Sequence, residues 1–126
     1  MDRAGGENFE YRYQWGDDRA MAIDALAEIA DDRSIRILVK ALQLESWTLR
    51  RRVVRALERV GKPAVPYLIE SLESGLWYVR EGAAIALGSI GDPGAIEPLI
   101  KLLGDSNRSV VEMAKKSINQ ISIRHG

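Results

Sequence analysis

The stretch ALGSIGDPGAIEPLIKLL, residues 86–103, decides the fold because the chain contains it in three versions. ALAEIADDRSIRILVKAL at 25–42 and ALERVGKPAVPYLIESL at 56–72 place apolar residues in the same order around a central break. VVEMAKKSINQI at 110–121 begins a fourth unit. A repeat of this length indicates a solenoid of stacked units. Equivalent residues are separated by 31, 30 and 31 positions, at Leu26, Leu57, Leu87 and Ile118.

Each unit contains two segments with the apolar period of an α-helix. In the second unit, Leu49, Val53 and Leu57 are spaced by four residues and form one stripe of a helix. The segment then stops at Gly61-Lys62-Pro63, and glycine followed closely by proline is typical of a helix end. A shorter helical segment follows this break. The expected helices span about 17–30, 34–44, 46–60, 64–73, 76–90, 94–103 and 107–122.

A two-helix unit of this size buries its apolar stripes only by stacking on its neighbours. Strand-like alternation is absent from the repeats, so the sequence predicts an all-α, right-handed α-α superhelix of about three and a half units. The first helix of each unit is expected on the convex side, and the second helix is expected to line a concave side. The predicted inward residues of the second helices are Ile35, Leu38, Val39 and Leu42, then Val65, Leu68, Ile69 and Leu72, then Ile96, Leu99, Ile100 and Leu103.

These units resemble the short HEAT-like repeats that were first associated with phycobilin lyases. The clearest match is WYVREGAAIALGSIGDPGAIEPLIKLL at 77–103, with a hydrophobic-Arg opening, a small-residue first helix and a Gly-Asp turn. The resemblance implies a HEAT-like repeat domain over 17–126, preceded by a non-repeat segment over 1–16. It implies a scaffold fold that serves many functions. We therefore expect a non-catalytic protein–protein interaction scaffold.

The resemblance also suggests one enzymatic alternative, phycobilin-lyase-like chromophore attachment or a chaperone role in it. Such a lyase joins a tetrapyrrole to a cysteine of its partner, so it needs no nucleophile of its own. HEAT-like iron hydroxylases use several His-Glu pairs, which a single histidine excludes. Nothing in the sequence marks a chromophore site.

Catalytic and metal-binding residue types are scarce in this chain. Cysteine is absent, and the one histidine, His125, is expected to lie in a disordered tail. GSIGDPG at 88–94 coincides with the helix stop of the other units, so it is interpreted as a turn rather than a phosphate loop. We therefore expect no enzyme activity, no cofactor, no catalytic residue and no metal site. The chain has no apolar run of membrane-spanning length, and its N-terminus lacks the apolar core of a signal peptide, so we expect a cytoplasmic protein with no membrane partner.

The outward residues of the second helices are the best candidates for binding. Stacked units place an apolar row beside a row of mixed charge on the concave face. Such a surface suits an extended peptide, a helix or a subunit of a partner protein, and a merely solvated face is the alternative. The predicted protein-binding residues are Ile37, Tyr67 and Pro98 in the first row and Lys40, Glu70 and Lys101 in the second.

Charge is distributed unevenly along the chain. Residues 1–32 have a net charge of −6 and residues 33–62 a net charge of +7, although the whole chain has a formal net charge of zero. The basic helix at 49–62 is the basis for an alternative function, nucleic-acid binding, which the sequence favours less than protein binding. An acidic protein surface, including that of a second copy, is an equally good counterpart. The surplus cations that form this electrostatic patch are Arg51, Arg52, Arg55 and Arg59.

Other recurrent side chains have a structural interpretation. Arg19, Arg50 and Arg80 share one register and are expected to bind helix-end carbonyls or an acidic side chain of the next unit. Trp47 and Trp77 also share a register and are expected to close the joints between units.

The two ends of the repeat array are less regular. FEYRYQW at 9–15 alternates aromatic and polar residues, and two interpretations stay open: a cap on the first unit, which we favour, or an adhesive strand for a partner. Ile118, Ile121 and Ile123 end in half a unit. We expect that end to mediate self-association or to join a larger solenoid.

Overall fold

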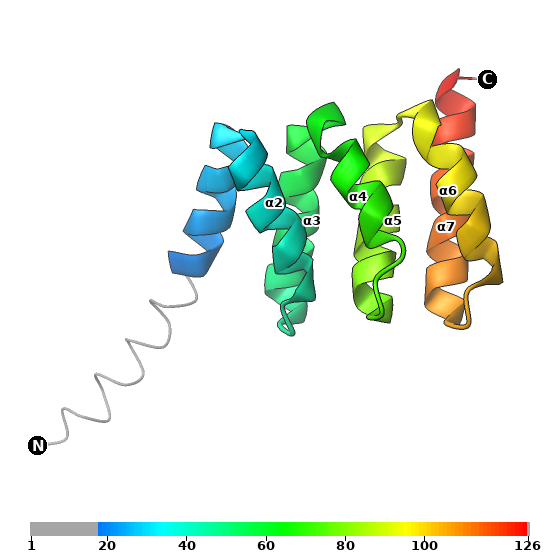
Figure 1. Ribbon diagram of the computed structural model, residues 1–126, viewed down its shortest axis with the longest axis horizontal. Coiled ribbons are helices and arrows are strands. Elements are labelled where there is room, and N and C mark those ends of the chain that lie inside the picture. The colour runs from blue at the N-terminus through cyan, green and yellow to red at the C-terminus, as the bar shows by residue number, and fades with distance from the viewer. Residues whose placement is uncertain (1–17, 126) are drawn as a thin grey trace, which may run out of the picture.

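The computed structural model describes residues 18–125 and shows a stack of paired helices (Figure 1). These residues form seven α-helices and no strand, which confirms the all-α solenoid. The aromatic segment at 9–15 lies outside the described residues, and both interpretations of it stay predictions. A first helix over residues 18–29 is followed by α2 (Asp32–Lys40), α3 (Trp47–Val60), α4 (Val65–Ser71), α5 (Trp77–Ile90), α6 (Ile96–Lys101) and α7 (Arg108–His125).

The helices form two layers. The helix at 18–29, α3, α5 and α7 make the first-helix layer, and α2, α4 and α6 make the second-helix layer, which faces the viewer in Figure 1. Short 3₁₀ turns at Lys62–Ala64 and Pro93–Ala95 join the layers after α3 and α5. A HEAT-like unit is thus one helix from each layer, and its neighbours stack along the long axis.

Local side chains fix where several helices begin. Asp31 Oδ1 accepts a hydrogen bond from the Ser34 amide at 2.8 Å, at the start of α2. Ser46 Oγ accepts one from the Leu49 amide at 3.2 Å, at the start of α3. These bonds satisfy amides that have no partner within the helix. The bond from the Ser34 amide also holds the pKa of the Asp31 carboxyl below its usual value.

Three of the first-layer helices are followed by a residue with positive φ. Gly61 has φ 78° after α3 and Gly91 has φ 82° after α5, as expected for glycine at a helix end. Ala30 has the equivalent place after the helix at 18–29, with φ 50°. A side chain is disfavoured in this conformation because Cβ crowds the backbone, so Ala30 is a strained version of the same helix end.

The core lies between the two layers, where the predicted apolar stripes meet. Leu38, Leu68 and Leu99 are fully buried in the second-helix layer, and Val53, Leu57 and Leu87 are fully buried in the first. The predicted inward stripes are therefore largely confirmed.

The prediction was wrong at the end of the third unit. Ile100 and Leu103 are 46% and 40% exposed, whereas Leu102, which was not among the predicted inward residues, is only 7% exposed. Leu102 and Leu103 lie in the 3₁₀ turn over Leu102–Gly104 that follows α6. Ile100 is exposed because, within the described residues, no further second-layer helix follows α6.

The two ends of the stack differ in polarity. On the helix at 18–29, Met21, Ala25 and Ile29 are exposed and spaced by four residues, so they form an uncovered apolar stripe. On α7, Ile121 is buried, Ile118 is partly buried and Ile123 is exposed. The other exposed residues of α7 are polar, among them Glu112, Lys115, Lys116 and Asn119. The outer face of α7 is therefore mostly polar, whereas Ile100 and Leu103 are exposed beside it in the second-helix layer.

His125 is an ordered part of this end, contrary to the prediction of a disordered tail. It is the last residue of α7, and its Nε2 lies 2.7 Å from the Gly91 carbonyl oxygen. The neighbouring Arg124 donates from Nη1 to the Ile90 carbonyl at 2.8 Å. Both contacts satisfy carbonyls at the end of α5, where a cation is favourable. None of the helices in the described part of the chain has the length and apolarity needed to cross a membrane.

Candidate protein-binding sites

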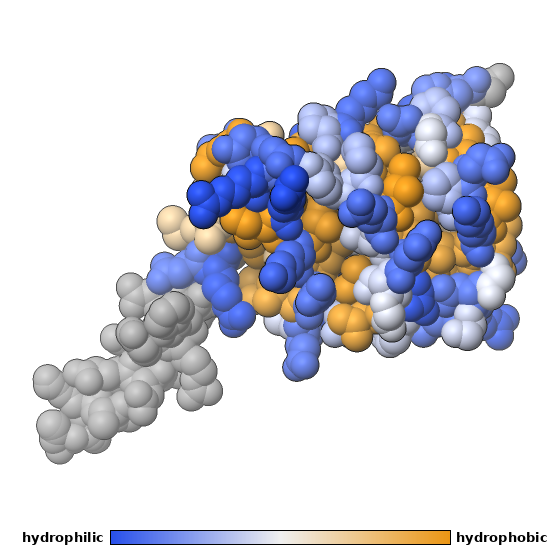
Figure 2. Space-filling model, viewed as in Figure 1, coloured by the Kyte–Doolittle hydropathy of each residue, from blue (hydrophilic) through white to orange (hydrophobic). Residues whose placement is uncertain are grey.

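A groove runs between α2 and α4 on the second-helix layer, with a volume of about 560 Å³. Side chains of mixed hydropathy cover this face of the molecule (Figure 2). The Tyr67 hydroxyl donates a hydrogen bond to the Asp32 carboxylate, and Arg36 Nε lies 3.1 Å from the same carboxylate. The Arg36 guanidinium also lies 5.8 Å from the centre of the Tyr67 ring. These three side chains hold one another in place at the rim of the groove. The groove is lined by Arg36, Val39, Lys40, Gln43, Tyr67, Glu70, Ser71, Ser74 and Val79.

The structure brings three of the six predicted binding residues together. Lys40, Tyr67 and Glu70 line the groove. Ile37 is exposed on α2 outside the groove lining, and Pro98 and Lys101 lie on α6. The predicted rows therefore share one layer, while the groove is lined by three of their members, on α2 and α4.

A second cleft, here called the outer cleft, lies between α3 and α5 in the first-helix layer and has a volume of about 430 Å³. Val54 and Gly82 are buried at its floor, and Ile85 is partly buried beside them. Aromatic and basic side chains surround this apolar floor. The full lining is Trp47, Arg50, Arg51, Val54, Arg55, Glu58, Tyr78, Glu81, Gly82 and Ile85.

The tryptophans do not close the joints, contrary to the prediction. Trp47 is 65% exposed, with the Arg51 guanidinium 5.6 Å from its ring centre. Trp77 is 44% exposed and packs edge-on against Tyr78 at a centroid distance of 5.8 Å. Each ring lies at the start of a first-layer helix and is exposed, so their shared register reflects a shared place on the surface.

Two of the four surplus arginines form an ion pair with a described residue. Arg52 Nη2 and Nε lie 2.9 Å and 3.3 Å from the two oxygens of Asp24, and Arg59 Nη1 lies 3.9 Å from the same carboxylate. The hydrogen bonds from Arg52 hold the pKa of Asp24 below its usual value. Arg51 contacts Trp47, and Arg55 has no ion pair with another described residue. The acidic helix at 18–29 thus neutralises part of the basic patch.

The repeated arginines have the structural role that was predicted, in the two units where their contacts are described. Arg50 Nη1 donates to the Leu44 carbonyl at 2.8 Å, and its guanidinium lies 4.5 Å from the centre of the Tyr78 ring. Arg80 Nη1 donates to the Ser74 carbonyl at 2.8 Å, and Nε and Nη2 bind both oxygens of Asp105 at 2.7 Å and 3.0 Å. Each arginine therefore fastens the turn that precedes its own helix.

Comparison with known protein families gives a direct match to this architecture. A family model described as HEAT repeats matches residues 16–76 and 43–119. The chain belongs to the HEAT-repeat family. The two-layered stack of helix pairs is the form that such repeats take.

Relatives of this HEAT-repeat chain carry a functional name. Phycocyanobilin lyase subunit alpha from Picosynechococcus is 38% identical over 96 residues, which cover 70% of this chain and 36% of that protein. The protein of the same name from Nostoc is 39% identical over 93 residues, which cover 73% and 32%. The chain thus spans about a third of the length of these curated relatives. An engineered protein of known crystal structure is 26% identical, with a TM-score of 0.48 over 79% of this chain and 54% of that one.

The outer cleft between two HEAT repeats was not predicted from the sequence. Its floor residues Val54 and Ile85 lie outside the predicted inward stripe, where one apolar residue in a helix is ordinary. One feature of the sequence could have indicated the cleft: the pair Trp77-Tyr78 follows Trp47 by one repeat. Trp47 on α3 and Tyr78 on α5 therefore lie on opposite sides of the same joint. No cluster of three or more residues able to bind a metal ion exists among residues 18–125.

Proposed function

We propose that this HEAT-repeat chain binds a partner protein through its second-helix layer, without catalysis of its own. The observation that supports the proposal most directly is the groove between α2 and α4, with Tyr67 at its rim and Lys40 and Glu70 along its lining. A tyrosine and charges of both signs beside partly apolar walls suit a peptide or a helix of a partner. Such a segment is bound by apolar contacts and is held in one position by polar contacts.

The environment of Tyr67 suits a preorganised contact. Its hydroxyl is hydrogen-bonded to Asp32, and its ring lies beside Arg36, so the side chain has one favoured orientation. A residue that is already ordered loses less conformational entropy when a partner binds. The exposed cations Lys40 and Lys101 on either side would orient an acidic partner segment along the layer.

Affinity capture from the native host, followed by mass spectrometry, tests this proposal. The wild-type chain and the double variant Tyr67→Ala, Lys101→Glu are compared as baits. We expect at least one protein to be retained by the wild type and lost with the double variant, while Tm changes by less than about 5 °C. Lys115→Glu on α7 is the control for a charge change on the other layer. Equal retention by all three baits would contradict the proposal.

Similarity to the phycocyanobilin lyase alpha subunits favours a second candidate, a role in handling a bilin chromophore as a lyase-like subunit or chaperone. Titration of phycocyanobilin into the chain tests it by absorption spectroscopy. A shift of the bilin spectrum that disappears on heat denaturation would support this candidate. An unchanged spectrum would remove it and leave the protein-binding proposal as it stands.

A further inference from the structure

We propose that the outer cleft is a second protein-binding site, which takes an acidic amphipathic segment of a partner protein. An apolar side chain of that segment enters the cleft between Trp47 and Tyr78, and its carboxylates bind Arg51 and Arg55. The site lies in the other layer from the groove between α2 and α4, so it goes beyond the function proposed above. With both sites, the chain would join two partners.

The residue types in the outer cleft are those that dominate protein-binding energy. Trp47 is 65% exposed although indole is among the largest apolar side chains. Trp, Tyr and Arg are the three types most enriched at binding hot spots, and all three surround the floor made by Val54 and Gly82. An exposed ring over a buried apolar floor offers a pocket in which a partner side chain loses water on several sides.

The charge of the cleft selects an acidic partner. Arg51 and Arg55 lie one helical turn apart on α3, and neither forms an ion pair with another described residue. The neighbouring depression against the helix at 18–29 shares these two arginines. Among the described residues that line these two hollows, five arginines stand against the three carboxylates of Asp24, Glu58 and Glu81. Two carboxylates one turn apart on a partner helix would match the spacing of Arg51 and Arg55.

A protein segment fits this chemistry better than nucleic acid does. Glu58 and Glu81 line the cleft beside the arginines, and a nucleic-acid backbone, with a phosphate at every nucleotide, would face them as well as Arg51 and Arg55, whereas a protein segment can place its carboxylates at the arginines alone. Arg52 and Arg59, the other two members of the basic patch, face Asp24. The apolar floor would gain nothing from a phosphate, whereas it suits a leucine or a phenylalanine beside an acidic residue.

The joint between α5 and α7 differs from the joint between α3 and α5, which contains the outer cleft. Ile85 and Lys116 are the repeat equivalents of Arg55, on α5 and α7. Between α5 and α7, Ser117 Oγ donates to the Ala84 carbonyl at 2.6 Å, and Gly88 lies directly against Ser117. That joint is closed by small residues. The basic and aromatic hollow therefore occurs where α3 meets α5.

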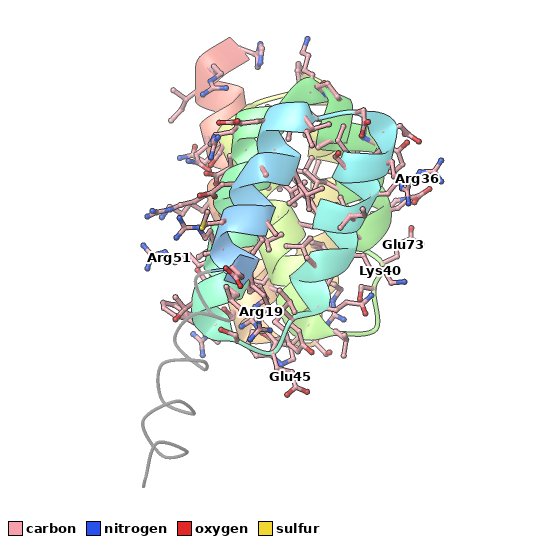
Figure 3. All side chains as sticks on the ribbon, turned by 90° about the vertical axis from the view of Figure 1, so that its left-hand side faces the viewer. Arg19, Arg36, Lys40, Glu45, Arg51 and Glu73 are labelled. Atoms are coloured by element: carbon pink, nitrogen blue, oxygen red, sulfur yellow. The ribbon has the colours of Figure 1, made fainter. Side chains whose placement is uncertain are left out.

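The two proposed sites are far enough apart to be tested separately. Figure 3 shows Arg51 on one side of the stack and Arg36 and Lys40 on the other. A variant in one layer leaves the other surface intact. Loss of binding at one site is thus distinguishable from loss at the other.

Selection of a phage-displayed peptide library against the full chain provides the test. We expect enriched sequences that combine acidic residues with one aromatic or aliphatic residue. A synthetic peptide of the enriched sequence should bind Arg55→Glu about tenfold or more weakly than the wild type, and Trp47→Ala likewise. Lys116→Glu makes the same charge change at the equivalent place on α7. We expect this control to bind as the wild type does.

Four results would overturn the proposal. These are no enriched acidic sequence, equal weakening by Arg55→Glu and Lys116→Glu, loss of peptide binding in the Tyr67→Ala, Lys101→Glu variant, and retention of a 20-base-pair duplex at about 50 mM salt that Arg55→Glu abolishes. The third result would place the peptide on the second-helix layer, and the fourth would assign the arginines to nucleic acid.

Discussion

The two halves of this HEAT-repeat stack are built from the same repeat and use their side chains differently. In the half made by α5, α6 and α7, here called the closed half, the Ser117 hydroxyl and the ion pair between Arg80 and Asp105 are largely buried. In the half made by the helix at 18–29, α2 and α3, here called the open half, the described ion pairs are exposed, while exposed apolar side chains occur in both halves. We therefore expect substitutions of these polar contacts to change stability more in the closed half than in the open half.

The joint between α5 and α7 illustrates the first half. Gly88 and Ala84 allow the two helices to approach closely, and the buried Ser117 hydroxyl bonds across the contact. The ion pair between Arg80 and Asp105 fastens the following turn, with side chains only 16% and 7% exposed. Breaking any of these contacts leaves a clash or an unpaired charge, so substitutions here should be costly.

The other half has its interactions at the surface. The pair between Arg52 and Asp24 is solvent-exposed, Ala30 ends its helix in a strained conformation, and Trp47 lies open. Exposed ion pairs contribute little to stability because water and salt screen them. Substitutions in this half should therefore change binding more than folding.

Gly88→Val should have the largest effect on stability. A Cβ at this position would lie 2.5 Å from Ser117 Oγ and 2.7 Å from Ser117 Cβ, so α7 would have to move away from α5. Overpacking of this kind costs about 3 kcal/mol at its upper range. We expect chemical denaturation to show a loss of that order, with a Tm lower by roughly 10 °C.

Gly75→Val is the matched control. Gly75 has no φ in the left-handed region and nothing within 4 Å of an added Cβ, so the same substitution should cost less than about 0.5 kcal/mol. Equal losses in the two variants would mean that close packing does not distinguish the joint between α5 and α7.

Asp105→Asn should have the next largest effect, because it leaves Arg80 largely buried without its carboxylate. We expect a loss of about 2 kcal/mol at pH 7, below the full value for a completely buried pair because both side chains keep some solvent contact. The hydrogen bonds from Arg80 hold the pKa of Asp105 below its usual value. The stabilisation is therefore complete above about pH 4, the value for an unfolded aspartate, and is lost as the pH falls through the lower folded pKa.

Urea denaturation of both chains across the pH range from 7 to 3 checks this prediction. The difference between wild type and Asp105→Asn should stay constant down to about pH 4 and shrink below it. Glu112→Gln removes an exposed ion pair with Lys115 and should change stability by less than about 0.5 kcal/mol at every pH. A pH-independent difference for Asp105→Asn would show that the pair acts through packing rather than charge.

The fold of both halves was predicted well from the sequence, because short local signals mark where each helix begins and ends. Glycine at the helix ends and the caps Asp31 and Ser46 mark boundaries within the chain itself, so the predicted helices agree with the observed ones to within a few residues. The errors at Ile100 and Leu103 lie in the last second-layer helix and the turn after it, where no further second-layer helix follows among the described residues. Burial at the end of the stack depends on that neighbour and is therefore less predictable than the helix itself.

The candidate sites were only partly predictable, because they depend on contacts between repeats. Lys40, Tyr67 and Glu70 follow from the period of the second helices. The pairing of Arg52 with Asp24 joins residues 28 positions apart and depends on how α3 packs against the helix at 18–29. The exposure of Trp47 likewise depends on the width of the joint, which no residue in its own helix determines.

Ala30→Gly should stabilise the open half by a smaller amount. Ala30 has φ 50°, at the place where Gly61 and Gly91 end their helices without a Cβ. Removing this Cβ should raise the free energy of unfolding by about 1 kcal/mol, measured by chemical denaturation. Ala22→Gly, in the interior of the same helix and exposed, should instead lower it by a similar amount. A loss in both variants would contradict the strained helix end.

Trp47→Ser should have the smallest effect on stability, despite removing the largest kind of side chain. The ring is 65% exposed, and its described ring contact is with the exposed Arg51, so we expect a change of less than about 0.5 kcal/mol. Trp77→Ser at the same register removes an edge-on contact with Tyr78 and should cost about 1 kcal/mol. Thermal melts of the two variants compare them directly. A larger loss for Trp47→Ser would mean that this ring supports the fold, and the open half would then contribute to stability as the closed half does.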